Sequence, residues 1–270
     1  MSAGNRAWLT TVECIMNVRN RRIGWLAAAC AAAAVTAVTM IVIPGPQGNV
    51  VSLRAASSAR ESVSVVASPL TAAGPLLNFT WGSGWITAQA PDDVTQHDLR
   101  EVFWYSDATP ALNSESCATW TAADGAIVQQ GAALRIAERG GVQQAITVTR
   151  NIYGKATWVF NVHLWVGSQF TLIGQFNLAP AFRLTSTEAR PLPWRLCARA
   201  IGSMVEFKVW LLGHPEPQWG DTTHGGAVIL PAGWEYAGVS GWYAGHLYTD
   251  DLASFRDLDV TTLPQVQRYD

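Results

Sequence analysis

The sequence predicts an all-β protein in which a two-sheet antiparallel sandwich follows one N-terminal transmembrane helix. Three observations lead to this prediction. Short segments with alternating apolar and polar residues recur throughout the C-terminal part of the chain. Turn signals containing glycine separate most of these segments, and no long amphipathic helical pattern interrupts them. Short strands joined by glycine-rich turns are typical of β-sandwiches and β-barrels.

The transmembrane helix is predicted from an uncharged, largely apolar run over residues 23–43. An α-helix of this length spans roughly 31 Å, close to the thickness of the hydrocarbon core of a bilayer. Arg19, Arg21 and Arg22 precede the run, and positive charges of this kind stay on the cytoplasmic side. We therefore expect an uncleaved signal anchor that leaves the C-terminal part outside the cell membrane. The alanine-rich run leaves a cleaved signal peptide open as an alternative.

Composition limits the function classes. Charged residues make up only 14% of the chain, which contains 23 Gly and 13 Trp, and this suits an exported all-β protein. Residues 1–43 contain four arginines and one glutamate, so the rest of the chain, with 14 basic and 19 acidic residues, is acidic. No basic block is present that could bind nucleic acid.

The same composition divides the chain into five parts. They are a cytoplasmic basic head (1–22), the signal anchor (23–43), a flexible stalk rich in Pro, Gly, Ser, Ala and Val (44–77), the sandwich (78–262) and a C-terminal tail (263–270). One short strand is expected within the stalk, at 62–66. The strands predicted for the sandwich are 101–105, 116–120, 126–129, 133–137, 144–150, 156–165, 170–176, 181–184, 194–200, 204–211, 227–230, 238–244 and 254–260.

Two of these strands, 156–165 and 204–211, have one apolar face and one polar, aromatic face, because side chains alternate across a strand. The residues expected in the core are Trp158, Phe160, Val162, Leu164, Val205, Phe207 and Val209. The residues on the opposite faces are Asn161, His163, Trp165, Glu206, Lys208 and Trp210. If both strands share a sheet, these six residues form one ligand-binding face suited to a glycan. The alternative is that the tryptophans pack under loops or in cross-strand pairs.

Cys117 and Cys197 are the two cysteines of the exported part, and we expect them to form a disulfide. The alternative is a pair of buried free thiols. Cys14 precedes the predicted membrane segment and should remain reduced.

Catalysis is not expected from the residues. The chain lacks a Gly-x-Ser-x-Gly motif, and its five histidines have no metal-ligand spacing. Glycoside hydrolysis needs two converging carboxylates. Glu206 is the one carboxylate expected on a polar, aromatic strand face, and its neighbour Lys208 is expected to pair with it. A glycoside hydrolase acting on cell-wall polysaccharide, with Glu206 as catalytic residue, is therefore kept as the alternative.

Three segments carry a resemblance to a known family: Phe207-Lys-Val-Trp210, Pro215-Glu-Pro-Gln-Trp219-Gly-Asp221 and Gly241-Trp-Tyr-Ala-Gly-His246. They are similar to concanavalin A-like (laminin-G-like) jelly-roll domains of actinobacterial surface proteins and of actinobacteriophage minor tail proteins. The resemblance covers about residues 79–262. It implies a jelly-roll sandwich that binds glycans or protein surfaces. The predicted membrane segment favours a bacterial surface protein over a virion component.

No cofactor is expected, and calcium is the alternative. Asp221 and His224 share one loop and could hold a divalent cation. Because some laminin-G-like domains bind calcium through loop aspartates, the resemblance adds Asp250 and Asp251. The alternative is that these aspartates stabilise turns with their own side chains.

These observations predict a membrane-anchored, exported module that binds a carbohydrate or another cell-surface ligand without catalysis. Two alternatives stay open beside it, the hydrolase of the same fold and a phage-related structural or adhesion protein. The sugar and the oligomeric state do not follow from the sequence.

Overall fold

The computed structural model describes residues 63–71, 76–92, 98–125, 127–152, 158–182 and 192–264. All of them belong to one compact unit, Ala55–Asp270. The predicted membrane segment, residues 23–43, lies outside these ranges. Within the ranges, no helix has the length and apolar character needed to cross a membrane.

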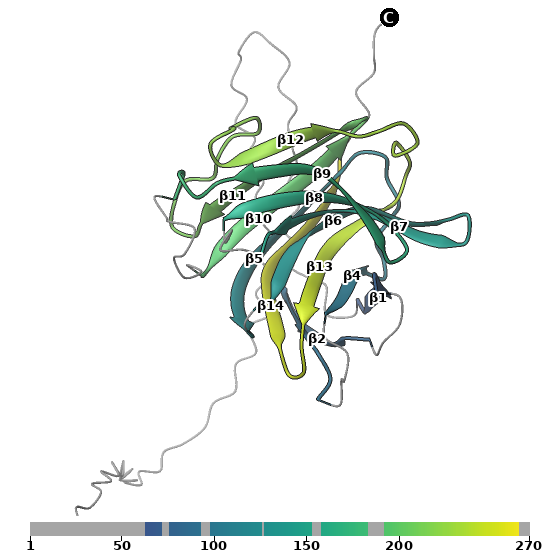
Figure 1. Ribbon diagram of the computed structural model, residues 1–270, viewed down its shortest axis with the longest axis vertical. Helices are drawn as coiled ribbons and strands as arrows, with labels where there is room; N and C mark the ends of the chain where they lie inside the picture. Colours follow the sequence, from purple (N-terminus) through teal and green to yellow (C-terminus); the bar gives the residue numbers. More distant parts are fainter. Residues whose placement is uncertain are drawn as a thin grey trace, which may run out of the picture. The chain divides into compact units, whose positions relative to one another are not determined.

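The described residues form two antiparallel sheets of seven strands each, packed as a jelly-roll sandwich (Figure 1). In spatial order, sheet A contains β1 (Val65–Pro69), β4 (Leu99–Tyr105), β13 (Val239–Leu247), β6 (Gln129–Arg139), β7 (Val142–Arg150), β8 (Val159–Val166) and β9 (Gln169–Asn177). Sheet B contains β12 (Gly225–Ile229), β11 (Met204–Leu211), β10 (Trp194–Ile201), β5 (Ser114–Asp124), β14 (Leu252–Thr262), β3 (Trp85–Gln89) and β2 (Asn78–Gly82). The predicted all-β, two-sheet sandwich is confirmed.

One apolar core lies between the sheets, and the predicted core faces are confirmed. Seven residues of β8 and β11, counting Trp158 just before β8, were expected to face inward. All seven are buried in this core: Trp158, Phe160, Val162, Leu164, Val205, Phe207 and Val209. Phe160 of sheet A contacts Phe207 of sheet B, with ring centroids 5.7 Å apart. Burial of large aromatic side chains of this kind contributes most of the apolar stabilisation of a sandwich.

Several strand boundaries differ from the prediction. β1 pairs with β4, so the sandwich includes residues 65–69 of the stretch expected to be stalk. β2 and β3 form a hairpin that was not predicted as strands. Residues 181–182 lie in a turn instead of a strand, because the chain leaves sheet A after β9. Residues 129–139 form the single long strand β6 in place of two short ones.

β6 is irregular at Arg135, which has a positive φ of 50° and lies at a bulge. Its guanidinium is buried and donates hydrogen bonds to backbone carbonyls of three loops. The acceptors are Leu112 O (3.0 Å), Gly202 O (2.5 Å) and Trp234 O. The five donors of one guanidinium therefore hold three loops against one end of the sandwich.

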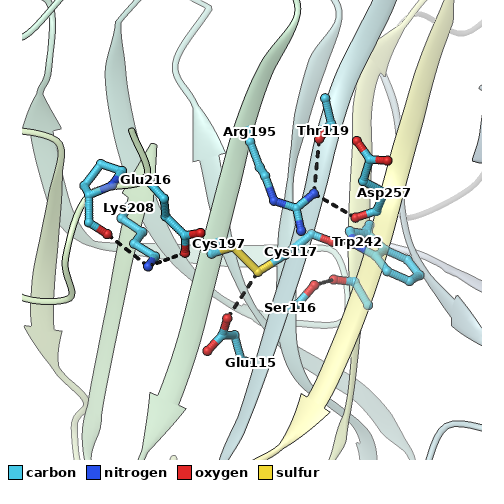
Figure 2. Close-up of a disulfide and its surroundings, with 12 residues drawn as sticks. Glu115, Ser116, Cys117, Thr119, Arg195, Cys197, Lys208, Glu216, Trp242 and Asp257 are labelled. Carbon is cyan, nitrogen blue, oxygen red and sulfur yellow. Dashed lines mark hydrogen bonds and ion pairs between the residues drawn. A yellow bond between two sulfur atoms is a disulfide. The ribbon is translucent and has the colours of Figure 1, made fainter. Parts of the chain in front are cut away.

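Cys117 and Cys197 form the predicted disulfide between β5 and β10, on the outer face of sheet B (Figure 2). They occupy directly paired positions, with Cα atoms 4.1 Å apart. Both cysteines are buried, and Trp210 and Trp219 pack against them. The bridge closes a loop with a sequence separation of 80 residues, which by chain entropy constrains the unfolded state by roughly 4–5 kcal/mol.

Replacing both cysteines, Cys117→Ser with Cys197→Ser, should lower the thermal unfolding midpoint by about 10 °C, because the unfolded chain regains the freedom of the closed loop. Differential scanning calorimetry under non-reducing conditions measures this change. The variant Cys14→Ser, outside the sandwich, is the control and should unfold like the wild type. An unchanged midpoint in the double variant would show that the bridge does not stabilise the domain.

Glu101 of β4 points into the core beside Phe103 and is only 1% exposed. Its Oε1 accepts a hydrogen bond from Leu77 N at 2.6 Å, whereas Oε2 is buried and has no hydrogen-bond partner in the described part of the chain. Burial raises the pKa of Glu101 to about 7, and the hydrogen bond from Leu77 opposes the rise. The folded protein therefore binds a proton at this carboxyl that the unfolded chain releases near its usual pKa.

The substitution Glu101→Gln should stabilise the protein above pH 7 by roughly 3 kcal/mol and leave its stability unchanged near pH 4. The variant is the more stable protein at high pH because the raised pKa of Glu101 makes the wild type lose stability as the pH rises from about 4.5 to 7. Urea unfolding of both proteins at pH 4, 6 and 8 measures the difference. An equal stability difference at all three pH values would contradict the raised pKa of Glu101.

Candidate ligand-binding site

The six residues predicted to form one ligand-binding face lie on opposite sides of the sandwich. β8 belongs to sheet A and carries Asn161, His163 and Trp165 on its outer face. β11 belongs to sheet B and carries Glu206, Lys208 and Trp210 on the outer face of that sheet. The prediction of a joint site is wrong, because the two strands lie in different sheets with the core between them.

The three residues of β11 are buried and already engaged. Glu206 Oε1 accepts a hydrogen bond from Arg199 Nε at 2.6 Å, so its partner is Arg199 and not Lys208 as predicted. Lys208 Nζ lies 2.7 Å from Glu216 Oε1 and donates to Pro217 O (Figure 2).

The loop between β11 and β12 accounts for this burial. Trp210 is 6% exposed because Trp219 of this loop and the disulfide cover it. Trp219 also lies 4.1 Å below the guanidinium carbon of Arg199 and 4.5 Å from Lys208 Nζ, as cation–π pairs. This outer face therefore offers no open aromatic platform at Trp210.

The geometry around Glu206 differs from the paired carboxylates of a glycoside hydrolase. Arg199 of β10 is paired in register with Glu206 on one side and with Glu115 of β5 on the other. The two glutamates thus flank one guanidinium in a row across the sheet. Hydrolysis needs two carboxylates that face the scissile bond across a groove, and here a cation occupies the position between them.

The outer face of sheet A around β8 combines polar and aromatic groups. Asn161 Oδ1 accepts a hydrogen bond from Gln175 of β9 at 3.2 Å. Trp165 donates from Nε1 to Thr147 of β7 at 2.9 Å and is only 3% exposed, so it forms part of the floor. The exposed aromatic side chain is Phe170 of β9, which is 53% exposed. Its ring centroid lies 5.2 Å from Trp165 and 5.1 Å from His163.

Two buried polar atoms on this face have no hydrogen-bond partner among the described residues. They are Nδ1 of His163 and Oγ1 of Thr149, which lies on the neighbouring strand β7 opposite Asn161. His163 is 9% exposed and Thr149 is 1% exposed. Burial, with smaller contributions from Arg100 and His246, lowers the pKa of His163 to about 4. Its imidazole is therefore neutral at physiological pH and can both donate and accept a hydrogen bond.

Asp98, Arg100 and His246 extend the same face toward β4 and β13. Arg100 lies 2.5 Å from Asp98 Oδ2, and His246 Nδ1 contacts Asp98 Oδ1. The guanidinium of Arg100 also lies over the ring of Trp165, 5.9 Å from its centroid. Burial lowers the pKa of His246, although its hydrogen bond to Asp98 opposes this. With neutral imidazoles and a compensated Asp98–Arg100 pair, the face has little net charge.

The backbone at Asp98 and His246 is irregular. Both residues have positive φ angles, 91° and 53°, although neither is glycine. A bulge between Gly245 and Leu247 of β13 turns His246 toward Asp98. Residues in sparsely populated backbone conformations occur preferentially at functional sites. We call the set Asp98, Arg100, Thr149, Asn161, His163, Phe170 and His246 the sheet A site.

The sequence predicted Asn161 and His163 of this site and missed the other five residues. Trp165, predicted as a ligand platform, lies beneath the site. The motif Gly241-Trp-Tyr-Ala-Gly-His246 marked β13 as unusual, because its second glycine lies next to the bulge. No sequence pattern signalled that Asp98 and Arg100 would lie beside His246, since 146 residues separate Arg100 from His246.

The predicted metal ligands do not gather into one site. Asp221 Oδ2 lies 2.9 Å from His224 Nδ1, and Oδ1 accepts from the backbone N–H of Thr223. Asp250 and Asp251 lie in the turn between β13 and β14, where Asp251 accepts a hydrogen bond from the backbone of Tyr248. The described residues contain one cluster of three potential metal ligands, Glu115, Cys117 and Cys197, and its two sulfurs form the disulfide. In the described part of the chain, the four predicted ligands therefore lie in two separate loops and form no cluster of three.

Comparison with known proteins shows distant structural likeness only. No protein-family model and no curated protein matches the sequence. Among solved structures, the carbohydrate-binding module CBM66 from Bacillus subtilis is 11% identical, with a TM-score of 0.44 over 73% of this chain and 95% of that one. The exoplasmic/lumenal domain of VIP36, bound to Ca²⁺ and Man₃GlcNAc, is 12% identical, with a TM-score of 0.47 over 76% and 89%.

A third similar structure is a protein of unknown function with a galectin-like fold, also from Bacillus subtilis. It is 12% identical, with a TM-score of 0.44 over 75% of this chain and 90% of that one. At these identities the ligands of the neighbours do not transfer to this chain, and its site has to be judged from its own residues.

The imidazole of His163 should remain neutral down to about pH 4, because protonation would place a charge in a buried environment beside Arg100. Histidine ring NMR signals followed between pH 3.5 and 8 test this, with the variant His163→Gln used for assignment. The urea-unfolded protein is the control and should titrate near pH 6.5. Because the folded pKa is the lower one, stability should be complete above pH 6.5 and fall as the pH drops toward 4. If the imidazole of His163 titrated near pH 6.5 in the folded protein, this would contradict its burial.

Proposed function

We propose that this protein binds a neutral carbohydrate through the sheet A site, without catalysing its hydrolysis. The observation that carries the proposal is a pair of buried polar atoms, His163 Nδ1 and Thr149 Oγ1, which have no hydrogen-bond partner among the described residues and lie on the same face as the exposed ring of Phe170. Buried polar atoms are almost always hydrogen-bonded in native proteins. Two such atoms on one face therefore indicate a missing polar partner.

The chemistry of the site suits a sugar. A sugar ring presents hydroxyl groups that donate and accept hydrogen bonds, together with an apolar face of C–H groups. The amide of Asn161, the imidazole of His163 and the hydroxyl of Thr149 can exchange hydrogen bonds with hydroxyls. Phe170 can pack against the apolar face. The compensated charges of Asp98 and Arg100 favour a neutral ligand over an ionic one.

The proposal places the sandwich outside the cell membrane, anchored by residues 23–43 on the surface of a bacterium. The apolar run and the three preceding arginines support the anchor. The disulfide supports an oxidising compartment, since stable disulfides are rare in the cytosol. The relation to actinobacterial surface proteins, as opposed to actinobacteriophage tail proteins, is part of this proposal.

A glycan array probed with the full chain in detergent tests the proposal. Binding of at least one neutral glycan is expected, and Phe170→Ala and Asn161→Ala should each weaken it about five- to tenfold, because each contact contributes about 1 kcal/mol. Trp85→Ala is the matched control, since this exposed tryptophan lies on sheet B.

Thermal unfolding of each variant shows whether the fold is kept. Binding that survives both substitutions in folded protein would exclude the sheet A site, and the absence of binding to every glycan would favour the adhesion or structural alternative.

A further inference from the structure

A cavity of about 650 Å³ lies beside β11 of sheet B, away from the sheet A site. It is formed by the end of β11, the loop between β11 and β12, and the turn that follows β9. Its lining residues are Ala181, Phe182, Trp210, Leu211, His214, Pro215, Glu216, Pro217, Asp221 and His224. Cavities of this volume hold ligands of small-molecule size. We refer to it as the β11 pocket.

The walls of the β11 pocket differ from the sheet A site in charge. Among the described residues, the acidic side chains of the lining are Glu216 and Asp221, and no lysine or arginine lines the pocket. Lys208 lies behind Glu216 and neutralises it. Asp221 has His224 as its side-chain partner and no lysine or arginine partner among the described residues, so its carboxylate is the acidic group of the lining that no such cation neutralises.

Asp221 is held in a fixed position and ionised form. Its Oδ2 lies 2.9 Å from Nδ1 of His224, and its Oδ1 accepts from the backbone N–H of Thr223 at 2.8 Å. The side-chain hydrogen bond with His224 is the main reason why the pKa of Asp221 lies below its usual value, and backbone hydrogen bonds add to it. Because Nδ1 of His224 faces Asp221, its other ring nitrogen, Nε2, is the one left for a ligand.

The apolar part of the lining provides contact surface for an organic body. Phe182 packs against Trp158 of the core and against His224, with centroids 4.4 Å and 5.9 Å away. Leu211, Pro215 and Pro217 complete this wall. An apolar wall beside a hydrogen-bonded carboxylate is a combination that binds an ammonium group on a compact body, and it disfavours anions.

We propose that the β11 pocket is a second ligand site, which binds a small organic cation: a primary ammonium group on a body about the size of one sugar. A metal ion is disfavoured, because the side chains of this pocket do not bring three ligand atoms together in the described residues. The proposal is independent of carbohydrate binding at the sheet A site, which uses different residues on the other sheet.

Isothermal titration calorimetry of the full chain with three matched sugars tests the proposal. The probes are D-glucosamine, which is cationic, N-acetyl-D-glucosamine, which is neutral, and D-glucuronate, which is anionic. We expect glucosamine to bind at least tenfold more tightly than the other two, and more weakly at high salt. Asp221→Asn and Glu216→Gln should each reduce this preference at least fivefold.

Two control variants separate the two sites. Glu138→Gln, the same kind of change at an exposed position of β6, should leave glucosamine binding unchanged. Phe170→Ala, in the sheet A site, should also leave glucosamine binding unchanged. This variant therefore distinguishes a failure of carbohydrate binding at the sheet A site from a failure of cation binding at the β11 pocket.

Equal affinity for all three sugars, or a glucosamine preference that survives both pocket substitutions, would overturn the proposal. The absence of measurable heat with every probe, confirmed by unchanged tryptophan fluorescence of Trp210 and its neighbours, would also overturn it. If one pocket variant fails to fold, the other carries the test.

Discussion

Apolar side chains from two seven-stranded sheets meet in one core, and this burial decides where every other residue can lie. Phe160 of β8 and Phe207 of β11 contact each other across the core. Because neighbouring side chains on a strand point in opposite directions, His163 and Lys208 must then lie on opposite outer faces. Packed sheets are about 10 Å apart, so the outer faces cannot combine into one site.

A side chain on the outer face of a sheet in this sandwich is not necessarily exposed to solvent. On sheet B, the loop between β11 and β12 folds back so that Trp219 covers the disulfide and Trp210. On sheet A, Leu70 and Trp165 belong to a second apolar cluster outside the main core. Tryptophan suits such positions because its indole ring can be buried while its N–H donates a hydrogen bond. The buried tryptophans among the described residues therefore lie both between the sheets and on their outer faces.

The polar groups that remain available lie where strand geometry is irregular. At the bulge in β13, His246 departs from the alternation of its strand and meets Asp98 and Arg100. At the bulge in β6, Arg135 departs in the same way and holds three loops together. Both residues have positive φ angles, which regular strands do not contain. One irregularity builds a candidate binding face, and the other fixes the loops at one end of the sandwich.

The sequence by itself determined most of the strands, the core face of β8 and β11, and the cysteine pair. These features depend on local alternation, on turn residues and on the presence of only two cysteines in the sandwich sequence. Only the tertiary structure decided that β8 and β11 lie in different sheets, that Glu206 pairs with Arg199, and that Trp165 and Trp210 are buried. The physical reason is that sheet pairing and loop packing join residues far apart in the chain, as Arg100 and His246 are, and alternation within a strand carries no information about the partner strand.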